Sequence, residues 1–133
     1  MRTVKIAMAS REFTKVQKIA LQNTSECVSL DAELEELAKK GKQLVISPKD
    51  YVVLDITTDK PNLSGNENYK NMVVIDRNGT RYATGSNSFM EAFINIYEIM
   101  HEDEDDPQYD IVVKRKDSKN YKGKYFLTCD IVA

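Results

Sequence analysis

The spacing of apolar residues in the first third of the chain predicts one strand and two helices. TVKIAMA at residues 3–9 predicts a short strand. After Ser10, the apolar residues Phe13, Val16 and Ile19 recur at helical spacing. A second helix is predicted before the apolar spacing changes to that of strands, and it has start and stop signals as well as an apolar stripe.

This second helix is predicted at residues 30–40. Leu30, Leu34 and Leu37 form its apolar stripe. Acidic side chains lie in its first turn and two lysines in its last, which suits the helix dipole. Gly41 is placed to end it.

After this helix the period of the apolar residues changes to two, which indicates strands. KQLVIS (42–47) and YVVLDITT (51–58) predict one long strand that is interrupted near Pro48, where a bulge or bend fits. The polar segment DKPNLSGNENYKN (59–71) is predicted to be a loop.

A β-hairpin is predicted next, because MVVID and TRYAT flank an Asn78-Gly79 tip. Asn-Gly favours a two-residue type I′ turn, which places Asp76 opposite Arg81. The next pair along the strands is then Ile75 and Tyr82. This register turns Val73, Ile75 and Tyr82 toward the core, and Met72 and Arg81 outward.

A third helix and two strands complete the chain. Residues 88–91, Ser-Phe-Met-Glu, form a capping box at the start of the helix. Two further strands are predicted at YDIVVKRK (109–116) and KYFLTCDIV (124–132). The apolar face of the helix consists of Phe89, Phe93, Ile96 and Met100.

The order of these elements predicts an α+β fold that is mainly β. A helix between the third and fourth of five strands is the layout of the OB-fold, a small Greek-key barrel. Its first strand must bend to serve both halves of the sheet, which suits the interruption near Pro48. We therefore predict one compact domain, with an N-terminal extension at 1–41 packed on an OB-type nucleic-acid-binding barrel at 42–133.

Composition narrows the class of protein. The chain has 133 residues, of which 41% are hydrophobic, which is enough for a single core. No apolar run approaches the roughly 18 residues of a membrane span, and no signal peptide is visible, so a cytoplasmic protein is expected. Cys27 and Cys129 are expected to be free buried thiols, and His101 an ordinary loop residue. No metal and no cofactor are predicted.

The charges are segregated although the net charge is only −2. Residues 26–36 carry five acidic and no basic side chains, and residues 102–106 are all acidic. In contrast, six of the eleven residues 114–124 are Lys or Arg, with Tyr121, Tyr125 and Phe126 among and just after them. Such segregation can create a positive surface on an acidic protein.

The basic stretch coincides with a binding loop of the expected fold. An OB-fold holds its ligand with the loop between strands 1 and 2 and the loop between strands 4 and 5. Both loops here combine lysines with a tyrosine, and single-stranded nucleic acid is bound by cations and stacking rings. Along the last predicted strand, Leu127, Cys129 and Ile131 share the face expected to meet the core. Phe126 is therefore predicted on the outer face, where it either stacks on a base or packs under the N-terminal helices. The predicted nucleic-acid-binding residues are Lys60, Tyr69, Lys70, Arg81, Lys114, Arg115, Lys116, Lys119, Tyr121, Lys122, Lys124 and Phe126.

From about Asp50 onward the chain resembles the small single-stranded DNA-binding proteins of bacteriophages and mobile elements of Gram-positive bacteria. The resemblance lies in KDYVVLDI, in DRNGTRYATGSNSF running into MEAFINIYEIM, and in KNYKGKYFLTCDIV. It implies an OB-type protein that coats single-stranded DNA during replication or recombination in the bacterial cytoplasm. Replication or recombination proteins and a second copy of the chain are then candidate partners. The housekeeping bacterial proteins of this kind end in an acidic tail, whereas the acidic segment here is internal.

Two other classes of function were weighed against DNA binding. A protein-interaction module, which inhibits or recruits a host protein, would use the acidic surfaces at 26–36 and 102–106. An enzyme has the least support, because the chain contains no glycine loop for phosphate and no cysteine–histidine site. The expected protein is therefore a non-enzymatic binder.

Overall fold

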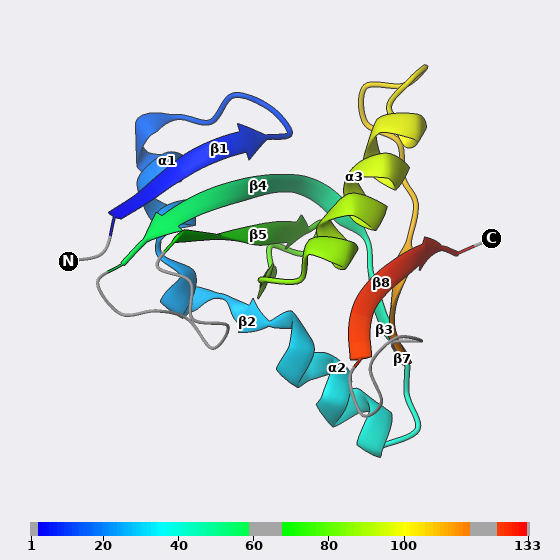
Figure 1. Cartoon of the computed structure of the whole chain (residues 1–133). Coiled ribbons are helices and arrows are strands. Elements are labelled where there is room, and N and C mark those ends of the chain that lie inside the picture. Colours follow the sequence, from blue (N-terminus) through cyan, green and yellow to red (C-terminus); the bar gives the residue numbers. More distant parts are fainter. Residues whose placement is uncertain (1–2, 59–67, 118–124, 133) are drawn as a thin grey trace. The chain divides into compact units, whose positions relative to one another are not determined.

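The computed structural model describes residues 3–58, 68–117 and 125–132 (Figure 1). Within them the chain is α+β and mainly strand, as the sequence predicts. Two compact units are interleaved in the sequence. The first contains Met1–Ser29 and Asp50–Gly85, and the second contains Leu30–Lys49 and Ser86–Ala133. The N-terminal 41 residues thus contribute to both units, and the predicted division at residue 41 stays a prediction.

The first unit is built on a five-stranded sheet. Its strand order is β1 (Thr3–Ala9), β4 (Pro48–Thr57), β5 (Asn68–Asp76), β6 (Arg81–Thr84) and β2 (Val28–Ser29). The β1–β4 and β5–β6 pairs are antiparallel, whereas β2 pairs with β6 in parallel. A short 3₁₀ turn, η1 (Thr24–Glu26), precedes β2.

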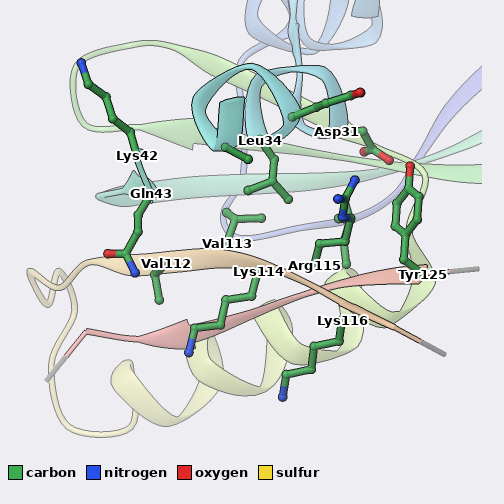
Figure 2. A pocket seen from close by; sticks show the side chains of 13 residues that line it. Asp31, Leu34, Lys42, Gln43, Val112, Val113, Lys114, Arg115, Lys116 and Tyr125 are labelled. Atoms are coloured by element: carbon green, nitrogen blue, oxygen red, sulfur yellow. The ribbon is translucent and has the colours of Figure 1, made fainter. Parts of the chain in front are cut away.

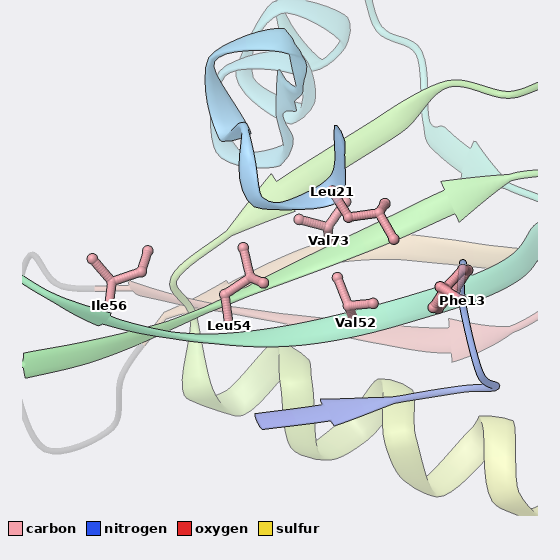
Figure 3. Close-up of a cluster of buried hydrophobic side chains, with 6 residues drawn as sticks. All are labelled: Phe13, Leu21, Val52, Leu54, Ile56 and Val73. Atoms are coloured by element: carbon pink, nitrogen blue, oxygen red, sulfur yellow. The ribbon is translucent and has the colours of Figure 1, made fainter. Parts of the chain in front are cut away.

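One face of this sheet is covered by the segment around α1 (Lys15–Gln22). Phe13 and Leu21 are buried against alternate residues of the sheet (Figure 3). Those sheet residues are Val52, Leu54, Ile56 and Val73. The apolar residues that alternate along β4 therefore pack against the N-terminal segment.

The second unit has a three-stranded sheet and two helices. The sheet order is β3 (Leu44–Ile46), β7 (Ile111–Asp117) and β8 (Tyr125–Ile131), with both pairs antiparallel. The helices are α2 (Leu30–Lys39) and α3 (Asn87–Met100). The Ser88 hydroxyl donates to the Leu127 carbonyl at 2.6 Å, which ties α3 to β8. Neither sheet closes on itself in the described residues.

Several predicted boundaries are confirmed. The predicted long strand breaks at Ser47: β3 pairs with β7 in one sheet, while β4 pairs with β1 and β5 in the other. The helix at 30–40 ends as predicted, because Gly41 adopts a φ of 69° and donates to the Ala38 carbonyl.

The hairpin register predicted from Asn-Gly is wrong by one residue. Ile75, not Asp76, lies opposite Arg81. A type I′ turn needs positive φ at both central residues, but here only Gly79 has it, with φ 92°. The loop therefore contains three residues, and Asp76 N–H donates to the Thr80 carbonyl at 2.8 Å. Met72, predicted to face outward, is fully buried, whereas Tyr82 and Ile75 are only partly buried.

Two helix starts also differ from the prediction. Thr14 caps α1 in a complete capping box with Gln17. Ser10 donates to Asp50 at 3.1 Å, so it links the end of β1 to β4. Ser86 rather than Ser88 caps α3, and its hydroxyl accepts from Phe89 N–H at 3.2 Å. The predicted loop at 59–71 ends earlier, because β5 already begins at Asn68.

Candidate nucleic-acid interface

The β7–β8 hairpin brings together the largest group of predicted binding residues that the structure describes. Its register pairs Lys114 with Thr128, Arg115 with Leu127 and Lys116 with Phe126. Because side chains alternate along a strand, Lys114 and Lys116 lie on one face and Arg115 on the other. Cationic side chains therefore occupy both faces of the hairpin.

The first face combines cations with an accessible ring. Phe126 is 40% exposed and lies directly opposite Lys116. The prediction that Phe126 is on the outer face of its strand is confirmed, while Leu127 and Cys129 on the other face are buried. An exposed phenyl ring can stack on a base, and the neighbouring ammonium group can bind a phosphate of the same strand.

The second face carries an arginine–tyrosine pair. The Arg115 guanidinium carbon lies 4.7 Å from the centroid of the Tyr125 ring, a cation–π contact. Tyr125 is 52% exposed. Tyr125 lies just after the basic stretch of the sequence but is not among the predicted binding residues. The signal that could have found it is the register itself, since Tyr125 shares a face with Arg115 when the two strands pair.

Lys114 has a carboxylate partner on the same face. Its ammonium nitrogen is 2.8 Å from an oxygen of Asp130, and both side chains are about half exposed. The hydrogen bond and the charge of Lys114 lower the pKa of the Asp130 carboxyl. A phosphate that binds Lys114 must therefore compete with this carboxylate.

The predicted binding residues of the first unit have different surroundings. Tyr69 belongs to β5 rather than to a loop, and it is partly buried against the core that Leu21 covers. Lys70 lies 3.5 Å from Asp55 on the neighbouring strand. Arg81 donates to the Ala20 carbonyl at 2.9 Å, so it supports the end of α1.

A shallow depression of about 610 Å³ lies beside Lys70 in the first unit. Thr3 and Lys5 of β1 line it together with Tyr69. Lys5 was not among the predicted binding residues, because nothing in the local pattern of the first strand indicates that β1 pairs with β4.

Five predicted binding residues lie outside the described part of the chain. They are Lys60, Lys119, Tyr121, Lys122 and Lys124. Their assignment stays a prediction, and the interface below rests on residues 111–117 and 125–131 alone.

Two free thiols lie among the described residues. Cys129 is buried and free, and burial raises its pKa to about 12. Cys27 is free but only partly buried, and its pKa is also raised by burial. Within the ranges described, no three His, Cys, Asp or Glu side chains are grouped to hold a metal ion. No helix in this part of the chain is long and apolar enough to cross a membrane.

Comparison of the chain with family models, with curated proteins and with solved structures gave no match.

Proposed function

We propose that this protein binds single-stranded DNA without strong sequence preference and without catalysis, in the replication or recombination of a phage or mobile element. The observation that carries the proposal is the composition of the β7–β8 hairpin. One of its faces combines Lys114 and Lys116 with the exposed Phe126, and the other combines Arg115 with the exposed Tyr125.

The physical basis is the chemistry of an unpaired strand. Its phosphates attract ammonium and guanidinium groups, and its bases expose flat apolar faces that a duplex hides. A protein of net charge −2 gains little from general attraction to DNA, so affinity must come from a local group of cations. Among the described residues, the β7–β8 hairpin is where such cations adjoin half-exposed rings.

We also propose that the two sheets are the halves of an OB-type barrel. The support is the order of the elements: the β3–β4 segment pairs with strands of both sheets, and α3 follows the third strand of the predicted barrel. Hydrogen exchange and nuclear Overhauser contacts between β6 and β8 would test closure. If β6 contacts β2 but not β8, the sheets do not close into a barrel.

The direct test of function is binding to a single-stranded oligonucleotide and to its duplex across a salt series, followed by fluorescence anisotropy. The change Lys114→Ala with Lys116→Ala removes two cations from the hairpin. For single strands, each lost phosphate contact reduces the slope of log K against log salt by about 0.7, so the slope should fall by about 1.4.

A matched control removes two cations elsewhere. Lys39→Ala with Lys40→Ala changes the charge equally at exposed positions outside the hairpin. If both double variants reduce the slope alike, the hairpin is not the interface. If the wild type does not bind single strands at low salt, the proposal fails.

A protein-interaction module is the second candidate, and one observation favours it. Val16 and Ile19 of α1 are 77% and 70% exposed, although their helical spacing is typical of a packed face. Exposed apolar residues that form a contiguous patch with a polar rim mark interaction sites, and Val16 and Ile19 lie one turn apart on the same helix. A stable heterocomplex with a host protein that Ile19→Asp disrupts, together with weak and salt-insensitive DNA binding, would favour this candidate.

A further inference from the structure

A pocket of about 450 Å³ lies within the second unit, between α2 and the β7–β8 hairpin. Its volume is in the range of about 300–1,000 Å³ that is usual for small-ligand sites. Figure 2 shows Leu34 of α2, and Arg115 and Tyr125 of the hairpin, pointing into the space between the helix and the strands. The pocket therefore adjoins the proposed DNA interface.

The walls of the pocket have three kinds of chemistry. Its apolar part is formed by Leu34, Ala38, Val113 and Leu127. The Arg115–Tyr125 pair supplies a flat surface with a cation on it. The exposed Glu35 of α2 supplies a carboxylate, which only accepts hydrogen bonds when it is ionised. Asp31, Lys42 and Gln43 also line the pocket, and Asp31 lies beside Tyr125 (Figure 2). A flat ring that carries hydrogen-bond donors on its edge matches all three walls.

Beyond Val113, one edge of β7 has no neighbouring strand among the described residues. β3 pairs only with Ile111–Val113, so in the described residues β7 is paired by β8 alone from Lys114 to Asp117. Figure 2 shows the Lys114 and Lys116 side chains extending to the opposite side of β7 from Arg115. A DNA strand that passes around this open edge can place phosphates on the lysines and one base in the pocket.

We infer that the pocket accepts one base of the bound single strand, and that Glu35 makes it prefer a base with an exocyclic amino group, such as cytosine. This inference rests on the proposed function. The cytosine N4 amino group donates to a carboxylate, whereas uracil presents the acceptor O4 at the same place. The carboxylate therefore attracts cytosine and repels uracil, although the two rings have the same size and stacking surface.

The test compares the affinity of the full chain for oligo-dC and oligo-dU of equal length at one salt concentration. The two ligands have the same backbone charge, so their salt dependence should be equal and only the base should matter. A single good contact of this kind predicts about fivefold tighter binding of oligo-dC.

The variant Glu35→Gln keeps the size of the side chain but gives it a donor as well as an acceptor. It should reduce the dC/dU affinity ratio to about one. Glu36→Gln is the matched control, because Glu36 is the next residue of α2, is exposed and does not line the pocket. It removes the same charge and should leave the ratio unchanged.

The outcomes separate this inference from the proposed function. A dC preference that Glu35→Gln abolishes and Glu36→Gln retains supports the pocket. Equal, salt-dependent binding of oligo-dC and oligo-dU overturns the pocket and leaves single-strand binding intact. A dC preference that persists in Glu35→Gln overturns the role of Glu35. Absence of binding to both ligands overturns the proposed function, and the pocket inference with it.

Discussion

The β5–β6 and β7–β8 hairpins carry similar side chains in dissimilar surroundings. Each has a lysine, an arginine and a tyrosine that could bind DNA. In β5–β6, Tyr69 is packed against a core and Arg81 is bonded to the Ala20 carbonyl. In β7–β8, Arg115 and Tyr125 contact each other, and Tyr125 remains half exposed. In the first set, the ring and the guanidinium therefore make contacts within the protein, whereas the Tyr125 ring of the second set is half exposed.

The difference arises from what covers each hairpin. The Phe13–Leu21 segment covers one face of the β4–β5 sheet. The Tyr69 ring packs against the core that this segment completes, and the Arg81 guanidinium donates to the Ala20 carbonyl. Along β7, exposure continues from Lys114 to Asp117, beyond the last residue paired with β3. Residue type alone thus does not show whether a ring and a cation are packed or exposed, because the covering segment decides.

The strongest test of this comparison removes the cover. Leu21→Ala deletes a side chain that is only 5% exposed, and it should lower the free energy of unfolding by about 2–5 kcal/mol, as measured by urea denaturation. Ile19→Ala on the same helix is the control, since Ile19 is 70% exposed and should change stability by less than about 0.5 kcal/mol. Equal effects of the two changes would mean that α1 does not pack on the sheet.

A second test replaces each of the two tyrosines, Tyr125 and Tyr69, with alanine in separate variants. Tyr125→Ala removes a stacking ring from the β7–β8 hairpin and should weaken single-strand binding by about 1–3 kcal/mol, measured by anisotropy. Its effect on stability should be small, because the ring is 52% exposed. Tyr69→Ala should show the opposite pattern, with lower stability and little change in affinity. If Tyr69→Ala weakens binding as much as Tyr125→Ala does, the two hairpins do not differ in function.

The parts of the fold that follow from hydrophobic period were predictable from the sequence. One example is the interruption near Pro48. Another is the pair of strands predicted at the end of the chain, which correspond to β7 and β8. Phe126 was also placed correctly on the exposed face, because alternation along a strand depends only on the order of residues. These features are local, so one sequence contains enough information to find them.

The missed features depend on single-residue choices or on distant contacts. Ser86 and Ser88 are both good helix caps, and only the contact of Ser88 with Leu127 separates their roles. The hairpin turn depends on whether Asn78 adopts positive φ, which it does not. Tyr69 was assigned to a loop although it belongs to β5, because no local pattern shows that Phe13 and Leu21 pack on the sheet that contains β5.

A smaller effect on stability is expected from Arg81, which supports the end of α1. Arg81→Ala removes the hydrogen bond to the Ala20 carbonyl at 2.9 Å, and it should lower the free energy of unfolding by about 0.5–1.5 kcal/mol. Single-strand affinity should change no more than it does for Lys39→Ala. Arg115→Ala should instead weaken binding and leave stability nearly unchanged. Binding losses of equal size in the two arginine variants would place the first unit in the interface.

The smallest expected effect concerns the ion pair on the β7–β8 hairpin. Asp130→Asn releases Lys114 from a partner 2.8 Å away. An exposed pair contributes about 0.2–1 kcal/mol, so single-strand binding should become tighter by about 1.4- to 5-fold. Asp103→Asn removes the same charge in the exposed acidic run and is the control. Equal gains in both variants would mean that only the net charge matters.

The pH dependence of this gain follows from the same ion pair. Lys114 holds the pKa of Asp130 below its ordinary value of 3.8, so the carboxylate stays ionised throughout pH 5–8. What the pair adds to stability is present above the unfolded-state pKa and is lost only as pH falls through the lower folded-state value. The affinity ratio of Asp130→Asn to wild type should therefore be constant from pH 8 to pH 5. A ratio that falls toward one within this range would show that Asp130 titrates there and that Lys114 does not hold it ionised.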